Sequence, residues 1–293
     1  MTRADGLALP NFLIVGAMKA GTSSLADLLD SHDDIFVAER ELHFFNDERA
    51  FARGLASYSR HFQGTHARWQ GEKTPVYSRI ADMGFLPQRI YDSLGADLRL
   101  LWIFRDPVDR AVSHYRHMLI TQGNPDRAKL IQRNGRLRTF AEVIAEELRD
   151  PPRSVIVSRG YYAEQVEAFR SLFPARNFFF CEFDQLRGNP QGLLDSACLF
   201  FGVAPIPVVR EPSRNRTDAR LRQGLFGKAI KRLRSGQIPT LTSLTNAARA
   251  RSQKAEIIRR FADIDEGAKA SLREHYRPHE DRLRAILDRQ PQA

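Results

Sequence analysis

The chain has 293 residues and a formal net charge of +10, with 42% hydrophobic residues, enough for one sizeable core. No apolar run approaches the length of a membrane span, and the N-terminus has no apolar leader segment. The two cysteines, Cys181 and Cys198, do not indicate a disulfide framework, and the histidines show no metal-binding spacing. We therefore expect a single domain over residues 1–293 without a metal centre.

The first informative segment joins an apolar run at 12–15 to a pattern of apolar residues at helical spacing. The run predicts a buried strand, and the turn between the two reads Gly-Ala-Met-Lys-Ala-Gly-Thr-Ser-Ser over 16–24. A glycine-rich turn between a strand and a helix directs backbone N–H groups and a helix N-terminus at one point. With the Lys19 cation and three hydroxyl groups nearby, this segment predicts a phosphate site. The alternative is an ordinary strand–turn–helix with a solvated lysine.

The position of the lysine separates this turn from the common nucleotide-binding loop. A Walker A loop places its lysine after the second glycine. Here Lys19 precedes Gly21, and no apolar strand ends in a Walker B-like aspartate. A P-loop nucleotide kinase or NTPase is thus the weaker hypothesis, and dependence on magnesium would distinguish it.

A second strand-to-helix junction follows at 99–118. The apolar run 100–104 predicts a buried strand, and Arg105 follows it directly. Asp106 is a plausible N-cap for a helix that begins at Pro107. Ligands bind at the carboxyl ends of strands in open α/β sheets, and the planar fork of an arginine matches a phosphate. The alternative is a local ion pair between Arg105 and Asp106.

Two further segments carry charged side chains between apolar flanks. Residues 40–45 read Arg-Glu-Leu-His-Phe-Phe and follow a short predicted strand at 35–37. We expect the two phenylalanines to anchor this loop in the core while Glu41 faces a substrate. Residues 71–77 read Gly-Glu-Lys-Thr-Pro-Val-Tyr. Taken singly, Glu41 could be a solvated loop carboxylate and Lys73 a surface lysine.

As an ordered set, these segments resemble the sulfotransferases that use 3′-phosphoadenosine 5′-phosphosulfate (PAPS), in particular bacterial relatives of the heparan-sulfate-type enzymes. Similar features extend through a Gly-Tyr-Tyr helix and a closing helix that contains Tyr276 and Leu283. The resemblance implies a P-loop-like α/β fold, and the alternation of strands and helices independently predicts a mostly parallel sheet with helices on both faces.

The resemblance also implies roles for individual residues. Glu41 corresponds to the general base, with Lys19 and His117 as further catalytic residues. Binding of the PAPS phosphosulfate and 3′-phosphate is expected at Lys19, Ala20, Gly21, Thr22, Ser23, Ser24, Arg105 and Ser113. Binding of the acceptor is expected at Arg40, His43, Lys73, His114 and Tyr162. The family usually has lysine where this chain has Arg40, so the positive charge is kept while its geometry differs.

The reaction that the resemblance implies is transfer of a sulfuryl group from PAPS to a hydroxyl or amine acceptor, without a required metal. A carbohydrate or glycan-like acceptor fits the branch of the family, and an anionic glycan would suit the basic composition. The resemblance further implies a soluble, cytoplasmic bacterial protein. A non-catalytic nucleotide- or glycan-binding protein is the remaining alternative, but binding alone would not need Glu41.

The resemblance fails around 205–255. Many eukaryotic relatives carry a Lys-Gly-Arg loop there that covers the nucleotide, and this chain has none. Its role would fall to arginines such as Arg214 and Arg216. Residues 224–255 could form a lid, an acceptor wall or a peripheral membrane helix, and we expect a basic helical insertion. Although basic residues concentrate here, no nucleic-acid-binding motif accompanies them. The sequence does not give the acceptor, the choice between O- and N-sulfation, or the oligomeric state.

Overall fold

The computed structural model describes residues 6–120, 130–134, 136–208, 257, 259–260 and 262–289. Arg214, Arg216 and the predicted insertion at 224–255 lie outside these residues. In the described part, no helix combines the length and the apolar character needed to cross a bilayer.

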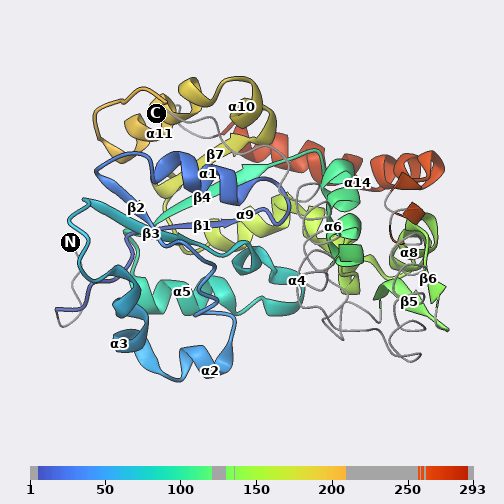
Figure 1. The fold of residues 1–293 in the computed structure, drawn as a ribbon, viewed down its shortest axis with the longest axis horizontal. Coiled ribbons are helices and arrows are strands. Elements are labelled where there is room, and N and C mark those ends of the chain that lie inside the picture. Colours follow the sequence, from blue (N-terminus) through green and yellow to red (C-terminus); the bar gives the residue numbers. More distant parts are fainter. Residues whose placement is uncertain are drawn as a thin grey trace, which may run out of the picture.

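A parallel sheet forms the centre of the molecule (Figure 1). Its strand order is β2-β3-β1-β4-β7, and every neighbouring pair is parallel. The predicted mostly parallel α/β fold is therefore confirmed. The strands are β1 (Phe12–Gly16), β2 (Ile35–Val37), β3 (Trp69–Lys73), β4 (Arg99–Phe104) and β7 (Phe178–Glu182).

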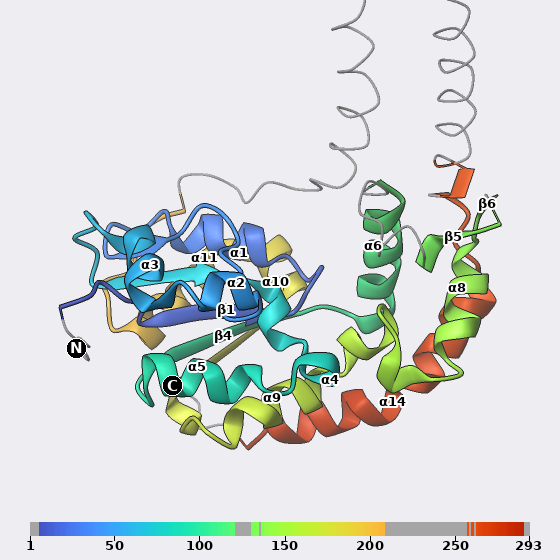
Figure 2. The ribbon, with the colours of Figure 1, turned by 90° about the horizontal axis from the view of Figure 1, so that it is seen from below.

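Helices cover both faces of this sheet, as predicted. Helices α1, α10 and α11 lie on one face, and α5 and α9 lie on the other (Figure 2). The helices are α1 (Thr22–Leu29), α2 (Glu48–Phe51), α3 (Gly54–Ser59), α4 (Ile80–Met83), α5 (Leu86–Leu94), α6 (Pro107–Ile120), α8 (Phe140–Glu147), α9 (Tyr162–Arg170), α10 (Phe183–Gly188), α11 (Pro190–Phe201) and α14 (Glu266–Leu287). A small hairpin pairs β5 (Gln132–Arg133) with β6 (Arg136–Leu137).

The sheet register brings functional loops to one edge. Strand β1 pairs with β3 on one side and with β4 on the other. The backbone N–H of Ala17, after β1, donates to Ile103 of β4 at 2.9 Å, and that of Thr74, after β3, donates to Ile14 at 3.1 Å. Because the three strands are parallel, the loops that follow them leave the sheet side by side.

A second core joins α6, α8 and α14 beside the sheet. The buried Glu147 carboxylate accepts hydrogen bonds from the backbone N–H groups of residues 155–157 at 2.9–3.0 Å. The Tyr276 hydroxyl donates to the Val157 carbonyl at 2.8 Å, and its ring is fully buried. The predicted inward orientation of Tyr276 is confirmed, and Leu283 packs partly buried against the sheet core.

Gly71 in β3 lies very close to the Phe12 backbone and ring of the neighbouring strand. A Cβ atom at Gly71 would lie 2.5 Å from the Phe12 carbonyl oxygen and 2.6 Å from the Phe12 ring. Because both backbones are fixed by the sheet, we expect Gly71→Ala to lower the free energy of unfolding by about 1–3 kcal/mol, measured by urea denaturation. Gly188→Ala is the control, because no atom lies within 4 Å of a Cβ there. Wild-type stability in Gly71→Ala would contradict this account.

Candidate active site

The loop after β1 is shaped to present backbone donors to an anion. Lys19 and Gly21 have φ angles of 69° and 102°, which lie in the left-handed region. Helix α1 begins directly afterwards, and no side chain from the described part of the chain caps its N-terminus. Its first N–H groups are thus left for a ligand or solvent. This is the arrangement that the glycine-rich turn predicted.

The loop after β4 presents an arginine at the same edge. The Asp106 carboxylate accepts from the Asp109 N–H at 2.7 Å and caps α6, as predicted. Arg105 contacts the Asp109 carboxylate at 3.7 Å, and its buried Nε has no hydrogen-bond partner among the described residues. The Tyr162 hydroxyl donates to the Arg105 carbonyl at 2.9 Å. The backbone of this arginine is therefore fixed while part of its guanidinium is unsatisfied.

The ring of Phe183, at the start of α10, connects the two loops. A Cβ atom at Gly21 would lie 2.7 Å from this ring, so only glycine fits there without displacing it. The Arg105 guanidinium lies over the same ring, 4.7 Å from its centre. The two sequence motifs, more than eighty residues apart in the chain, therefore meet at one aromatic side chain.

Positive groups gather around this junction from α6 and the 157–160 turn. His114 is 2% exposed, and burial shifts its pKa well below the usual range. Arg159, Arg110 and Lys19 lower that pKa further, as does His117. Burial and the neighbouring positive charges thus hold the His114 imidazole neutral, and its buried Nδ1 has no partner among the described residues. Such a concentration of cations favours an anionic ligand.

Arg159 was missed by the sequence analysis as a site residue. Its Nη1 lies 3.0 Å from the Met18 sulfur in the loop after β1, residues 16–24, which we call the phosphate loop. Its Nε donates to the Val155 carbonyl at 2.8 Å. The sequence carried only a weak signal, an arginine next to the Gly-Tyr-Tyr motif.

The Glu41 carboxylate lies in the loop after β2 and is accessible. Its side chain is 40% exposed, and Oε2 lies 3.3 Å from Nε2 of His43. The hydrogen bond with Glu41 raises the pKa of His43, against the opposing effect of partial burial. Phe44 and Phe45 are buried, which confirms the prediction that they anchor this loop.

A fully buried carboxylate, Glu72, supports the Glu41 loop. The Tyr58 and Tyr77 hydroxyls each donate to its Oε1 at 2.7 Å, and the Thr74 hydroxyl donates to its Oε2 at 2.5 Å. The Leu42 N–H approaches both Glu72 Oε2 and Thr74 Oγ1, at 3.3 and 3.2 Å. The backbone next to Glu41 is therefore bound to strand β3. The sequence of 71–77 did not by itself indicate this role for Glu72.

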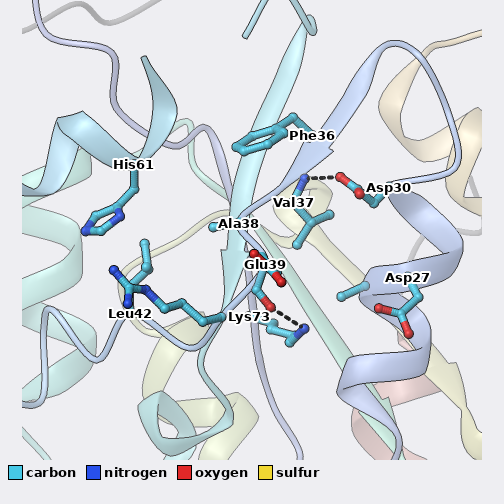
Figure 3. Close-up of a pocket in the computed structure, with 11 residues that line it drawn as sticks. Asp27, Asp30, Phe36, Val37, Ala38, Glu39, Leu42, His61 and Lys73 are labelled. Carbon is cyan, nitrogen blue, oxygen red and sulfur yellow. Dashed lines mark hydrogen bonds between the residues drawn. The ribbon is translucent and has the colours of Figure 1, made fainter. Parts of the chain in front are cut away.

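An open pocket of about 540 Å³ lies between α1 and the loop after β2 (Figure 3). Two of the predicted acceptor-binding residues, Arg40 and Lys73, line it. The Lys73 ammonium donates to the Glu39 carbonyl at 3.2 Å. The full lining consists of Ala26, Asp27, Asp30, Phe36, Val37, Ala38, Glu39, Arg40, Leu42, His61 and Lys73.

The remaining predicted site residues lie outside the pocket. Ser113 and His117 are half-buried, four residues apart on α6, as the helical spacing predicted. His43, His114 and Tyr162 do not line the pocket. Tyr162 is 3% exposed and its hydroxyl already binds the Arg105 carbonyl, so its predicted contact with the acceptor stays a prediction.

The residues of this edge fit a multiply charged phosphate ligand. Three groups here lack a hydrogen-bond partner among the described residues: the N-terminus of α1, the Arg105 Nε and the His114 Nδ1. A bound anion would supply hydrogen-bond acceptors to such groups. Within the described ranges, no group of three or more His, Cys, Asp or Glu side chains is placed to hold a metal ion.

Comparison with known proteins identifies relatives of this chain. The sequence profile of the sulfotransferase domain matches residues 9–218. Human heparan sulfate glucosamine 3-O-sulfotransferase 6 is 31% identical over 196 residues, and the human 3B1 enzyme is 28% identical over 271 residues. These matches cover 66% and 92% of this chain but only 52% and 61% of those proteins.

One solved structure is matched over almost its whole length. The crystal structure of a sulfotransferase from Alicyclobacillus acidocaldarius superimposes with a TM-score of 0.56 at 28% identity. The match covers 78% of this chain and 95% of the other chain.

The environment of Glu72 predicts whether this carboxyl group raises or lowers the free energy of unfolding as the pH rises. Burial raises its pKa in the folded protein, although its four hydrogen-bond donors oppose this. The folded state then binds the proton more tightly than the unfolded state, so ionisation of Glu72 lowers stability as pH rises above about 4.3. We expect the difference in unfolding free energy, wild type minus Glu72→Gln, to fall by at most about 1.4 kcal/mol per pH unit until the raised pKa is passed.

The measurement is urea denaturation of both proteins at intervals between pH 4 and pH 8. Glu274→Gln, at an exposed position on α14, provides the matched baseline. A difference that grows in favour of the wild type as pH rises would mean that the hydrogen bonds outweigh burial.

Proposed function

The chain belongs to the sulfotransferase family, and from this premise we propose that it transfers a sulfuryl group from PAPS to a hydroxyl or amine acceptor of carbohydrate type. The observation that carries the proposal is the meeting of two anion-binding loops at Phe183, beside a group of buried and half-buried cations. Its location in the cytoplasm stays a prediction from the sequence.

The two loops divide the charged groups of PAPS between them. Residues 19–24 would hold the phosphosulfate, because this turn offers the α1 N-terminus and the Lys19 cation. Arg105 and Ser113 would hold the 3′-phosphate. The unpartnered Nε of Arg105 supports this, because a guanidinium can bind a phosphate with two parallel hydrogen bonds.

The chemistry requires little covalent participation by the protein. The acceptor oxygen or nitrogen attacks sulfur in line, a new bond to sulfur forms, and the bond from sulfur to the bridging phosphate oxygen breaks. Lys19 and the loop N–H groups stabilise the charge that gathers on that oxygen. Because the leaving group is already a stable phosphate, a divalent metal is not needed in principle.

The acceptor proton goes to Glu41 in this proposal. Its carboxylate is accessible, and the hydrogen bonds around Glu72 fix the adjacent Leu42 backbone. His43 lies against the same carboxylate and would orient it, while His117 would assist at the acceptor. General-base catalysis requires this fixed geometry, because the proton acceptor must lie within hydrogen-bond reach of the acceptor hydroxyl.

The nucleotide assignment predicts a strong preference for a 3′-phosphate. We expect adenosine 3′,5′-bisphosphate to bind about 30- to 1000-fold more tightly than 5′-AMP, because losing charge-assisted bonds to a buried phosphate costs about 2–4 kcal/mol. Titration calorimetry measures both affinities. Arg105→Leu should remove most of the preference, while Arg149→Leu, at an exposed distant position, should retain it. Equal affinity of the wild type for the two nucleotides would remove the assignment.

If Glu41 is the general base, its replacement should lower turnover and leave the affinity for the nucleotide unchanged. In Glu41→Gln the side chain keeps its size but cannot accept the proton, so turnover should fall about 100- to 10,000-fold while affinity for adenosine 3′,5′-bisphosphate is retained. The assay follows transfer from radiolabelled PAPS to acceptors in a native extract, with Glu274→Gln as the control. Unchanged turnover in Glu41→Gln would move the base role to another residue, and a magnesium-dependent release of phosphate from ATP would favour a nucleotide kinase or NTPase.

A further inference from the structure

The turn at 157–160 brings a cation to the phosphate loop. It is a short helical turn that lies directly before α9. Arg159 extends from it, and the Nη1 of its guanidinium lies 3.0 Å from the Met18 sulfur, while its Nε donates to the Val155 carbonyl at 2.8 Å. Met18 directly precedes Lys19 in the phosphate loop. A second permanent positive charge therefore lies beside the residue that is expected to hold the phosphosulfate.

The backbone just before Arg159 is bonded to two buried, oppositely charged side chains. The Glu147 carboxylate of α8 accepts from the N–H groups of residues 155–157 at 2.9–3.0 Å. The fully buried Arg110 of α6 donates from Nη2 to the Ile156 carbonyl at 2.6 Å. Hydrogen bonds to charged groups are stronger than those between neutral groups. The N–H and the C=O of Ile156 are therefore both held firmly.

Side chains of α14 and α9 hold the other half of the turn. The Tyr276 hydroxyl donates to the Val157 carbonyl at 2.8 Å, and a Cβ atom at Gly160 would lie 2.6 Å from the Tyr276 ring. The Gln165 amide donates to the Arg159 carbonyl at 3.1 Å. Because the backbone and the Nε of Arg159 are both fixed, the outer part of its guanidinium is directed at the phosphate loop before any ligand binds.

The surroundings of His114 indicate which part of PAPS would meet Arg159. Burial lowers the pKa of this imidazole most, and the charged groups that lower it further include Arg159, Lys19 and His117. In the proposed function, Lys19 holds the phosphosulfate, His117 assists at the acceptor, and the 3′-phosphate belongs to the loop after β4. The sulfuryl group moves from the phosphate towards the acceptor, so Arg159 lies near its path.

We propose that Arg159 binds the sulfuryl oxygens of PAPS. Its positioning residues are Glu147, Arg110 and Tyr276, which fix the backbone of the 157–160 turn. This inference rests on the proposed sulfotransferase function and deepens it. A planar guanidinium donates two parallel hydrogen bonds to neighbouring oxygens of an anion. Arg159 takes no proton and forms no covalent bond; it stabilises the charge on the sulfuryl oxygens while the group is transferred.

A comparison of two nucleotides isolates this contact, because PAPS and adenosine 3′,5′-bisphosphate differ only in the sulfuryl group. Titration calorimetry without an acceptor measures both affinities. We expect Arg159→Leu to weaken binding of PAPS at least about tenfold and binding of the bisphosphate less than about threefold, since charge-assisted hydrogen bonds are lost only with PAPS. Arg153→Leu removes the same charge from a side chain that is 89% exposed, and it should leave both affinities unchanged.

Two results would overturn the sulfuryl contact. An equal loss of affinity for both nucleotides in Arg159→Leu would make this arginine a phosphate ligand. Unchanged affinity for both would leave it without a part in nucleotide binding. If Arg159→Leu does not fold, Arg159→Gln keeps a polar side chain without the charge, and the same expectations and the same two contrary results apply to it.

Tyr276→Phe tests the positioning role. It removes the hydroxyl that holds the turn and keeps the ring beside Gly160. We expect the ratio of PAPS affinity to bisphosphate affinity to fall at least about threefold, but to stay unchanged by this substitution once Arg159 is already leucine. Tyr115→Phe removes another buried hydroxyl of the same core, bonded to the Arg138 carbonyl, and should retain the ratio. Lower stability of Tyr276→Phe with an unchanged ratio would overturn the positioning role.

The wild type separates failure of this inference from failure of the proposed function. Tight binding of both nucleotides by the wild type, with no change in Arg159→Leu, would overturn the inference and leave the sulfotransferase proposal intact. A wild type that binds neither nucleotide would overturn both.

Discussion

The parallel pairing of β1 with both β3 and β4 is the constraint on which the candidate site depends. It places the loops that follow these three strands at one edge of the sheet, in contact through the Ala17 and Thr74 backbone N–H groups. The phosphate loop, the arginine loop and the segment that ends at Lys73 are separated by tens of residues in the chain. Only the sheet register brings them together. Any change that shifts β1 would thus disturb all three loops and the pocket together.

Two buried titratable groups on either side of this edge show how the fold controls charge. His114 is buried and has cations beside it, so its pKa is lowered and the neutral imidazole is favoured, while the positive charge of this region lies on Lys19 and the arginines. Glu72 is surrounded by hydroxyl donors, which satisfy both of its oxygens and connect them to the Glu41 loop. The first arrangement prepares the site for an anion, and the second fixes the backbone beside a carboxylate. Both need partners from distant parts of the chain.

The sequence predicted those elements whose signals are local. Apolar runs located β1, β2 and β4 to within about one residue, and Asp106 with Pro107 located the start of α6. Strand β3 was not predicted, because Gln70, Glu72 and Lys73 interrupt its apolar pattern. The Glu72 and Lys73 side chains are buried because Tyr58, Tyr77 and the neighbouring backbone satisfy them, and none of these contacts is visible in a window of sequence. Arg159 was missed for the same reason, since its proximity to Met18 arises only in the fold.

The pocket illustrates the difference between net charge and local charge. A net charge of +10 suggests an anionic partner, but charges at distances beyond about 10 Å are largely screened in salt solution, so specificity depends on the groups that line the site. Many of the basic residues belong to the segment 210–255, outside the described part of the chain, whereas Asp27, Asp30 and Glu39 lie within the pocket. Overall basicity would raise the rate at which any anion approaches the protein, PAPS included. Inside the pocket, these carboxylates together with Arg40 and Lys73 set a local charge that the net charge of the chain does not describe.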